Sequence, residues 1–273
     1  MKFQNDVLNP KLKKYIHHIS FKEFVPDNNN FIRVMPDCMT ELIINFGNSY
    51  QRTKGEKNEV INVSGSHFIG IKSNYCLVKP APKMKKVSVR FKPGTISLFT
   101  GYSSQEFCNE VIDAELIFGK EIKLLENEIY DNKDVKKIKT KIESFLLKKL
   151  KFNILALETI DKVNAIYRNP LFTKVESIKD KRSNYKQLER KFTKYIGLLP
   201  QSVIKIIRFN YSTKIKYENP QLSLTQIACR SGYYDQAHFV KSFKQLSGLL
   251  PKRYYPTLTP MSHSNQLVIN HQF

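Results

Sequence analysis

The residues best suited to chemistry lie in two short runs near the carboxyl end of the chain. The second run holds Gln236, Ala237, His238 and Lys241, spaced so that they share one side of a short helix. Glutamine can bond adenine at two atoms, lysine can bond the O6 and N7 atoms of guanine, and alanine can contact a thymine methyl group. The run therefore suits the reading of base edges in a major groove, although a merely solvated helix face would have similar residues.

The equivalent face of an earlier copy in the chain holds Tyr185, Lys186, Glu189 and Arg190. A constant offset of 51 residues relates the two copies, pairing Leu188 with Phe239, Arg190 with Lys241, Phe192 with Phe243, and the Gly-Leu-Leu-Pro run 197–200 with 248–251. Because the exposed hydrogen-bonding groups are duplicated together with the apolar ones, we favour recognition over simple solvation.

The elements that must position these faces are two helix-turn-helix units. In the second unit, Ser223 and Gln226 fit a capping box at the start of a helix, Gly232 suits a sharp turn, and Asp235 starts the next helix. The apolar residues at helical spacing are Leu224, Ile227, Ala228, Phe239 and Phe243. The pattern predicts units at about 174–200 and 223–251.

The first unit departs from this pattern. By the offset, Ser177 takes the place of the small Ala228, but Lys181 stands where Gly232 is expected. A lysine in a left-handed turn is costly, so the turn differs in type or position. Ser183 and Asn184 can both cap the helix that follows. Whether this unit reads bases or mainly contacts phosphates stays open.

Residues 160 to 255 resemble the paired helix-turn-helix domain of the AraC/XylS family of bacterial transcription regulators. The residues that carry the resemblance are Ile227-Ala228, Gly232-Tyr233, Asp235, Phe239, Lys241, Phe243-Lys244 and Gly248-Leu249-Leu250-Pro251. The resemblance implies double-stranded DNA and RNA polymerase as partners. It also implies that a connecting helix, roughly 201–217, sets two recognition helices into successive major grooves, and that a homodimer would bind repeated sites.

The charge distribution agrees with a nucleic-acid partner. The formal net charge is +21, and residues 151–273 contribute 20 Lys and Arg against 7 Asp and Glu. Such a surface neutralises phosphates regardless of sequence. Because Lys outnumbers Arg 36 to 9, part of this excess reflects composition. A non-specific architectural DNA-binding protein would explain the charge but not the duplicated faces.

Other function classes lack their signatures. The sequence holds no Walker loop, His-Glu-x-x-His or Gly-x-Ser-x-Gly motif, so no catalytic residue is predicted and we expect a regulator rather than an enzyme. The four cysteines have no metal-ligand spacing, so neither a metal nor a cofactor is predicted. No long apolar stretch or signal peptide is found, which predicts a cytoplasmic protein that does not contact a membrane.

The first half of the sequence has the composition and turn spacing that are typical of β-strands. Segments 40–47, 67–71 and 87–91 are rich in strand-forming residues and are separated by polar turns. After about residue 95 the period becomes helical. The predicted fold class is therefore α+β, with an N-terminal antiparallel β sheet or barrel followed by helices, and an all-α paired helix-turn-helix region at the carboxyl end.

This half resembles the N-terminal domain of a poorly characterised branch of the same family. The matching runs are Pro36-Asp37-Cys38-Met39-Thr40-Glu41-Leu42 and Val89-Arg90-Phe91-Lys92-Pro93-Gly94, with Cys38 where glycine is usual and Met39 where cysteine is usual. In the wider family such a domain often binds a small molecule and mediates dimerisation, so 1–150 is predicted as a sensing or dimerisation domain. Control by a protein partner is the alternative.

Glu41, His67 and Arg90 are the candidates for an effector pocket. Glu41 and Arg90 are charged residues in otherwise apolar strands, so they either form a buried ion pair between strands or face a cavity that binds a polar effector. His67 is a ligand contact or a hydrogen-bonded residue at a strand start.

The domain boundaries predicted from these patterns are 1–150, 151–255 for the DNA-binding domain, and 256–273 for a flexible tail. Within 120–150, one helix face carries Ile138, Ile142, Phe145 and Leu146. It either packs inside the domain or pairs two subunits.

Overall fold

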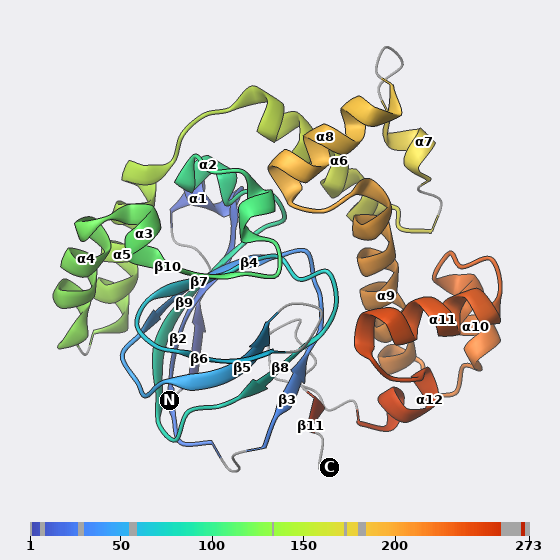
Figure 1. Cartoon of the computed structure of the whole chain (residues 1–273), viewed down its shortest axis with the longest axis horizontal. Helices are drawn as coiled ribbons and strands as arrows, with labels where there is room; N and C mark the ends of the chain where they lie inside the picture. Colours follow the sequence, from blue (N-terminus) through green and yellow to red (C-terminus); the bar gives the residue numbers. More distant parts are fainter. Residues whose placement is uncertain are drawn as a thin grey trace.

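Two antiparallel sheets make up the first half of the chain (Figure 1). The larger sheet has the order β1 Lys2–Asn5, β2 Ile16–Phe24, β9 Met84–Phe91, β4 Thr40–Asn45, β7 His67–Ile69 and β10 Val111–Asp113. The smaller sheet has the order β11 Ile269–Asn270, β3 Ile32–Val34, β8 Cys76–Lys79, β5 Tyr50–Lys54 and β6 Glu59–Val63. The computed structural model describes residues 2–5, 9–26, 30–54, 59–132, 134–171, 174–179, 184–257 and 269–270.

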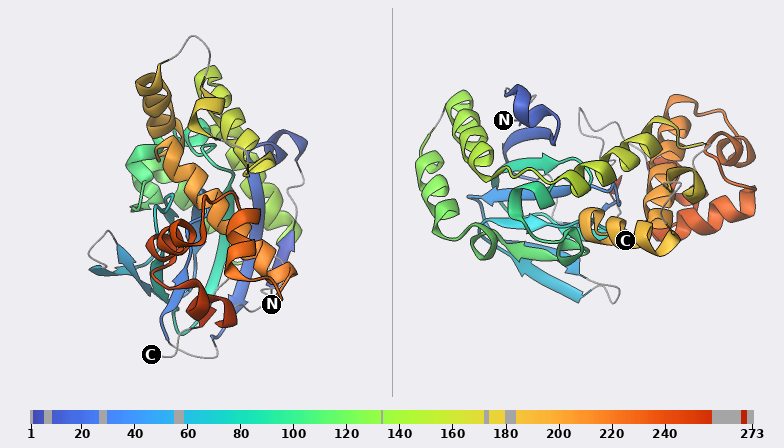
Figure 2. Two further views of the ribbon diagram at one scale, coloured as in Figure 1. Left: turned by 90° about the vertical axis from the view of Figure 1, so that its right-hand side faces the viewer. Right: turned by 90° about the horizontal axis from the view of Figure 1, so that it is seen from above.

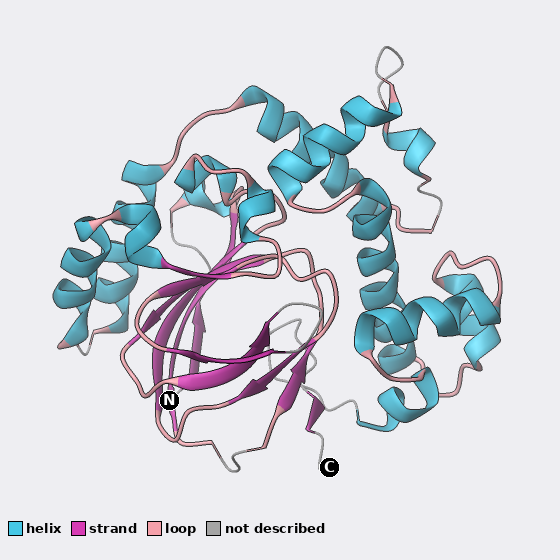
Figure 3. Cartoon of the chain, viewed as in Figure 1, coloured by secondary structure: helices cyan, strands magenta, loops and turns pink. Residues whose placement is uncertain are grey.

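Helices follow the sheets and separate into two groups (Figure 3). Those beside the sheets are α1 Pro10–Lys13, α2 Ser97–Thr100, the 3-10 turn η1 Ser104–Phe107, α3 Ala114–Phe118, α4 Lys120–Tyr130 and α5 Val135–Lys149. The others are α6 Ile154–Arg168, α7 Val175–Ile178, α8 Tyr185–Ile196, α9 Pro200–Glu218, α10 Leu224–Arg230, α11 Gln236–Ser247, α12 Pro251–Tyr254 and the 3-10 turn η2 Tyr255–Thr257. Figure 2 shows the sheets between α4–α5 on one side and α9–α11 on the other. The fold is therefore α+β, as predicted.

The outer face of the larger sheet packs against short helices through aromatic rings. Phe68 and Phe91 are fully buried, and Phe68 meets Phe107 of η1 and Phe118 of α3 edge to face. Phe91 meets Phe99 of α2 in the same way. Each such pair contributes about 0.5–1.5 kcal/mol beyond the area it buries. This packing fixes the strands that carry the candidate pocket residues.

The opposite face of the same sheet turns toward the smaller sheet and carries polar groups. Alternation along β4 and β9 places Glu41 directly opposite Arg90, and Ile43 directly opposite Ser88. His67 of β7 pairs with Ile43 in the same register and reaches Tyr50 of the smaller sheet. The three predicted pocket residues, Glu41, His67 and Arg90, thus share one face between the sheets.

The predicted strands at 40–47, 67–71 and 87–91 are confirmed as β4, β7 and β9. The apolar side of α5, formed by Ile138, Ile142, Phe145 and Leu146, is buried within this chain. That burial removes this face from a pairing role between subunits. Of the tail predicted to be flexible, Ile269–Asn270 pairs with β3, which corrects that prediction there, while residues 258–268 and 271–273 lie outside the described residues.

Within the described residues, no helix is both long and apolar enough to cross a membrane.

Candidate functional site

The second recognition helix, α11, presents the predicted face to solvent. Gln236, Ala237, His238 and Lys241 are all exposed. On the opposite side Phe239 and Phe243 are 0% exposed, as the four-residue spacing predicts. Asp235 caps the helix by accepting a hydrogen bond from the His238 amide at 2.7 Å. The Thr225 hydroxyl donates to Gln236 Oε1 at 2.6 Å, which positions the glutamine amide at the helix start.

The first recognition helix, α8, has the same construction. Tyr185, Lys186 and Arg190 are exposed and Glu189 is half-buried. On the buried side, the deeply packed residues are Leu188 and Phe192. Asn184 is the N-cap and forms a capping box with Gln187. Of the two caps that the sequence allows, Asn184 is therefore the one used, and Ser183 lies outside the described residues.

The helices that precede the two recognition helices are not equivalent. In α10, Ser223 and Gln226 form the predicted capping box, Ala228 is 1% exposed, and Gly232 follows with φ +75°. In α7, by contrast, Ser177 is exposed and its hydroxyl donates to Lys174 O at 2.7 Å. Ser177 does not fill the buried place of Ala228, so the prediction from the offset is wrong for this helix. Lys181 lies outside the described residues.

Both units touch the β-rich half at equivalent positions of the repeat. In the first unit, the Tyr195 carbonyl accepts a hydrogen bond from the Ser104 hydroxyl at 2.7 Å. In the second unit, the Leu246 carbonyl, 51 positions on, accepts one from the Tyr75 amide at 2.9 Å. The recognition helices are thus held at their carboxyl ends and exposed at their amino ends.

Glycine is required at both contacts. Gly197 and Gly248 end α8 and α11 with φ +89° and +73°, conformations that glycine adopts without strain. A Cβ at Gly197 would lie 2.6 Å from the Ser104 carbonyl oxygen, and one at Gly248 would overlap the ring of Tyr75. These positions end the helices and also allow the β-rich half to approach closely.

Arg33 completes the contact of the second unit. Its Nη1 donates to the Ser247 carbonyl at 3.0 Å, and its guanidinium lies 4.1 Å from the centre of the Tyr75 ring. Arg33 is 7% exposed. A planar guanidinium suits such a place, since it can bond in its plane and stack on a ring at the same time.

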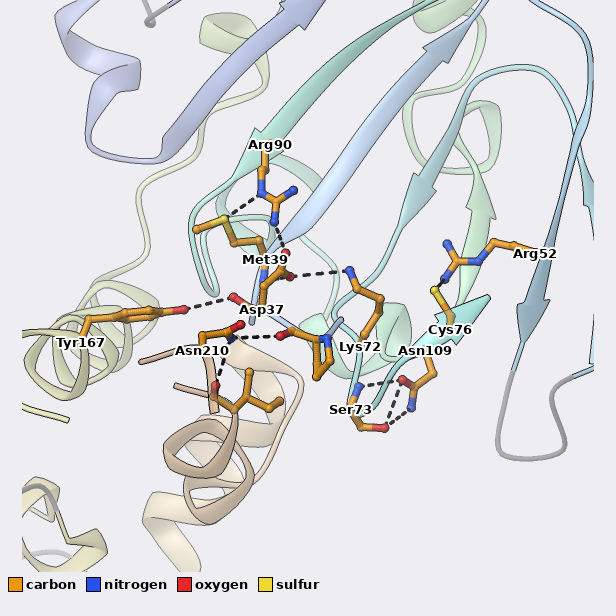
Figure 4. A network of polar contacts seen from close by, with 12 residues as sticks. Asp37, Met39, Arg52, Lys72, Ser73, Cys76, Arg90, Asn109, Tyr167 and Asn210 are labelled. Atoms are coloured by element: carbon orange, nitrogen blue, oxygen red, sulfur yellow. Dashed lines mark hydrogen bonds and ion pairs between the residues drawn. The ribbon is translucent and has the colours of Figure 1, made fainter. Parts of the chain in front are cut away.

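The two motifs of the β-rich half meet in a buried polar cluster beside α6 and α9 (Figure 4). The Asp37 carboxylate accepts a hydrogen bond from Arg90 Nη2 and lies 3.6 Å from Lys72 Nζ. The Asp37 carbonyl accepts from the Tyr167 hydroxyl of α6 at 3.1 Å, and the Pro36 carbonyl accepts from Asn210 Nδ2 of α9 at 3.0 Å. The cluster therefore ties the motifs to helices α6 and α9.

This arrangement changes the pairing expected for Arg90. Its carboxylate partner is Asp37 rather than Glu41, although Glu41 lies opposite it in the strand register. Glu41 instead accepts a hydrogen bond from Ser88. Burial raises the pKa of Glu41, but the charge of Lys86 and the Ser88 hydroxyl outweigh it, so the net pKa is lowered. Glu41 therefore stays ionised at neutral pH.

His67 is hydrogen-bonded at both ring nitrogens. Nε2 lies 2.8 Å from the Tyr50 hydroxyl and Nδ1 lies 2.9 Å from the Gly65 carbonyl. Burial lowers the pKa of His67 to about 4, so the ring is neutral at pH 7. A neutral imidazole donates one bond and accepts the other, which fits these two partners.

The backbone conformation at Cys38 explains why glycine is usual at this position of the motif. Its backbone has φ +60°, a left-handed conformation that costs a residue with a Cβ about 1–2 kcal/mol. The Asp37 side chain supports the turn by accepting from the Met39 amide at 3.1 Å. Burial raises the pKa of the Cys38 thiol to about 12, so the thiol is not a reactive nucleophile.

Sequence reasoning missed the residues that join the two halves. These are Arg33, Tyr75, Ser104, Tyr167 and Asn210. The contacts of Tyr75, Tyr167 and Asn210 involve backbone atoms of the β-rich half. Sequence periodicity does not mark such contacts. The available signal was the repeated Gly-Leu-Leu-Pro run, which begins at the two glycines that lie against the β-rich half.

Comparison with protein-family models gives two matches. Residues 182–255 match a helix-turn-helix domain, and residues 9–113 match a domain of unknown function (DUF6597). The first covers both recognition helices and the helix between them. The second covers both motifs of the β-rich half and, of the polar cluster, Pro36, Asp37, Lys72 and Arg90. No curated protein matches the chain.

Solved structures similar to this chain include ToxT from Vibrio cholerae, with 15% identity, a TM-score of 0.49, and coverage of 89% of this chain and 99% of that one. A second ToxT structure, described as bound to unsaturated fatty acid, has 15% identity and a TM-score of 0.47 over 97% of this chain and 100% of that one. The C-terminal domain of AraT, a response regulator from Geobacillus stearothermophilus, has 20% identity and a TM-score of 0.36, and covers 41% of this chain and 94% of that one.

The matched domain, the duplicated capped helices and their exposed basic and amide side chains lead to one assignment. Residues 182–255 are a helix-turn-helix domain of the kind that binds DNA, and residues 9–113 belong to a domain of unknown function.

Proposed function

We propose that α11 reads base edges in one major groove and that α8 enters the next groove. The observation that carries this proposal is the duplicated exposed face, held on two helices that are capped and packed in the same way. Gln236 and Lys241 have the chemistry for adenine and guanine, and Ala237 for a thymine methyl group. His238 lies beside them and can donate to a base or a phosphate.

The connecting helix supports the spacing of the two grooves. α9 has 19 residues, which span roughly 28 Å at the α-helical rise. One turn of B-DNA is about 34 Å. α8 precedes α9 and α10 follows it at the opposite end (Figure 1), so α9 would hold the two recognition helices apart on the scale of one turn of DNA.

In the first unit, Tyr185, Lys186, Glu189 and Arg190 would contact DNA. The Tyr185 hydroxyl bonds Glu189; burial, and after it the Glu189 charge, raise the pKa of Tyr185. The carboxylate of Glu189 can accept from a cytosine amino group but repels phosphate. We therefore expect α8 to combine base contacts by Arg190 with phosphate contacts by Lys186.

Selection of bound sequences from a random duplex library tests this function. The full chain should enrich a motif with two conserved blocks about one helical turn apart. Gln236→Ala and Lys241→Ala should each relax the preference at one or two positions in one block, by about 1–3 kcal/mol of discrimination. Gln245→Ala, at an exposed position further along the same helix, is the matched control. Equal loss on selected and scrambled DNA would identify the residues as phosphate contacts, and no enriched motif would favour a non-specific architectural protein.

We further propose that the β-rich half senses a small molecule at the face that its larger sheet turns toward the smaller sheet. Glu41, His67 and Arg90 share that face, and the polar cluster ties the same sheet to α6 and α9. An effector bound there could therefore alter how the DNA-binding helices are held. Control by a protein partner is the alternative, and a ligand screen by thermal shift on the full chain distinguishes the two.

Other partners belong to the proposal as well. Family resemblance supports contact with RNA polymerase and work in the cytoplasm, where bacterial DNA lies. A homodimer would have to use a surface other than the buried side of α5. Sedimentation velocity with and without a DNA site measures the number of chains, and paired half-sites in the selected motif would support two.

A further inference from the structure

A cleft lies between the two helix-turn-helix units, on the side where the recognition helices begin. Its cavity volume is about 200 Å³, several times the roughly 30 Å³ that one water molecule occupies in the liquid. Its walls come from three elements, with Lys174 and Glu176 at the start of α7, Lys205 on α9 and His238 on α11. Figure 1 shows α7 beside the start of α9, and α10 and α11 toward its end. The cleft therefore has room for a phosphate group.

The cleft joins the two recognition faces. His238 belongs to the exposed face of α11, and its ring meets that of Tyr233 edge to face with the centres 5.5 Å apart, at one end of the cleft. Glu176, at the other end, lies close to the start of α8, since burial and the charges of Glu189 and Glu176 raise the pKa of Tyr185. A duplex that contacts both recognition faces must therefore pass over the cleft.

The floor of the cleft is held in place by packing and hydrogen bonds. Arg208 Nε donates to the Pro170 carbonyl at 3.0 Å. The same nitrogen lies under the turn between α10 and α11, where a Cβ added at Gly232 would be 3.2 Å from it. Ile204 and Tyr233, which also line the cleft, are buried. Because the floor is ordered before any partner arrives, a contact made here costs little ordering.

The rim of the cleft is exposed and carries an excess of positive charge. Lys174, Gln201 and Lys205 are all exposed. Gln201, Lys205 and Arg208 follow one another at helical spacing, so they form one stripe along α9. Three lining residues are lysine or arginine and a single one, Glu176, is acidic, so the cleft favours an anion. Lysine binds phosphate as a point charge and needs no fixed geometry to do so.

We propose that the cleft holds the sugar-phosphate backbone of DNA between the two major grooves, with Lys174 and Lys205 as phosphate contacts and Gln201 as an uncharged donor. Two helices that enter successive major grooves from one side face the minor groove between them. The backbone that borders this minor groove then crosses the protein surface between the helices, where the cleft lies. Such contacts position the protein on DNA but carry no sequence information. The inference rests on the proposed entry of α8 and α11 into two grooves.

Lys174→Gln and Lys205→Gln in the full chain test the contacts from the protein side. Each should lower the affinity on the order of fivefold at about 0.1 M salt, equally for selected and scrambled duplexes, and make the slope of log binding constant against log salt shallower by about one. Because both lysines are exposed, the variants should keep the melting temperature of the parent. Lys214→Gln is the matched control, since it is exposed on the opposite side of the same helix. An equal loss for Lys214→Gln would show a general effect of charge and overturn the proposal.

Methylphosphonate linkages, which lack the phosphate charge, test the contacts from the DNA side. In the selected site, methylphosphonates between the two conserved blocks should weaken binding of the parent chain on the order of fivefold. The same linkages should cost the double variant Lys174→Gln, Lys205→Gln nothing further, because its contacts are already lost. Methylphosphonates on the opposite side of the duplex are the DNA control. No cost in the parent, or an equal cost in the parent and the double variant, would place the backbone elsewhere and overturn the inference.

The two sets of results also separate this inference from the proposed function. Two enriched blocks with base-specific losses in Gln236→Ala and Lys241→Ala, but no effect of the central methylphosphonates, would overturn the cleft contact and leave recognition intact. If no motif is enriched, the cleft variants are compared with Lys214→Gln on a random duplex. Weaker binding of the cleft variants alone would then keep the cleft as a DNA contact and overturn recognition by α8 and α11, whereas equal binding of all variants would overturn both.

Discussion

The two helix-turn-helix units share their recognition helices and differ in the parts that support them. α8 and α11 both begin at a capping side chain, bury two residues four apart and end at a left-handed glycine. The helices before them differ, since α10 has seven residues with a capping box, whereas α7 has four and leaves Ser177 exposed. The two units therefore share the framework of this helix, namely its cap, its buried pair and its terminal glycine, more closely than the helix that precedes it.

The units also differ in what they contact on the β-rich half. Gly197 lies against backbone, the carbonyl of Ser104, whereas Gly248 lies against the side chains of Tyr75 and Arg33. A backbone contact can yield only if the η1 turn moves, but side chains can change rotamer. A Cβ added at Gly197 would therefore meet a more rigid neighbour than one added at Gly248.

The largest effect should come from the two buried phenylalanines. Phe192→Ala and Phe243→Ala each remove a ring that is 0% exposed, and we expect a loss of about 3–5 kcal/mol. Phe243 should lie at the upper end because its ring contacts those of Phe209, Phe239, Tyr254 and Tyr255. Urea denaturation of the full chain measures both. A parent-like midpoint for Phe243→Ala would contradict the orientation of α11.

Gly197→Ala and Gly248→Ala should sharpen the contrast between the two contacts. Each alanine pays about 1–2 kcal/mol for the left-handed conformation. Overpacking should add about 1–3 kcal/mol at Gly197, where the neighbour is backbone, and less at Gly248. Thermal unfolding gives the order of the two losses. A larger loss at Gly248 would contradict this difference between the two glycine contacts.

Arg190→Ala and Lys241→Ala compare the two recognition faces on DNA. We expect Lys241→Ala to lose about 1–3 kcal/mol of discrimination at one or two base pairs, without loss of stability. Arg190→Ala should do the same if α8 reads bases. If the slope of the logarithm of the binding constant against the logarithm of salt concentration becomes shallower by about one while specificity is kept, Arg190 contacts phosphate instead. Competition with singly substituted duplexes measures each case.

The smallest effect should come from the helix caps. Asn184→Ala and Asp235→Ala each remove an acceptor for an amide at the start of a recognition helix, at a cost of about 1 kcal/mol. The two losses should agree within about 0.5 kcal/mol, because the helix starts are alike. Gln245→Ala serves as an exposed control that should be neutral. A clear difference between the caps would break the equivalence of the two helices.

Local patterns were enough to predict the recognition helices and several strands. Helix periodicity, the caps Ser223 and Asp235, and the strand composition at 40–47 all depend on neighbours in sequence. The fold class follows from the same patterns. The constant offset of 51 worked for α8 and α11 but failed for α7, because Ser177 does not pack where Ala228 does.

Contacts between distant segments could not be predicted. Glu41 and Arg90 lie opposite each other in the strand register, but the ion pair that the sequence offered as one alternative does not form, because Arg90 pairs with Asp37 on the irregular segment before β4. The two-residue period of a strand predicts which strand residues share a face, but it does not predict where a carboxylate on a neighbouring loop lies. The same holds for Tyr75 and Arg33, whose partners are backbone carbonyls more than 150 positions away.

The pairing of β11 with β3 makes the DNA-binding half an insertion within the smaller sheet. Arg33 is the residue opposite Ile269 in that register, and it also bonds Ser247 of the second unit. The second unit is therefore tethered on both sides, by α9 before it and by the returning strand after it. If the second unit leaves the β-rich half, it stays attached at both of its ends. Its return is therefore an intramolecular step with a high effective concentration.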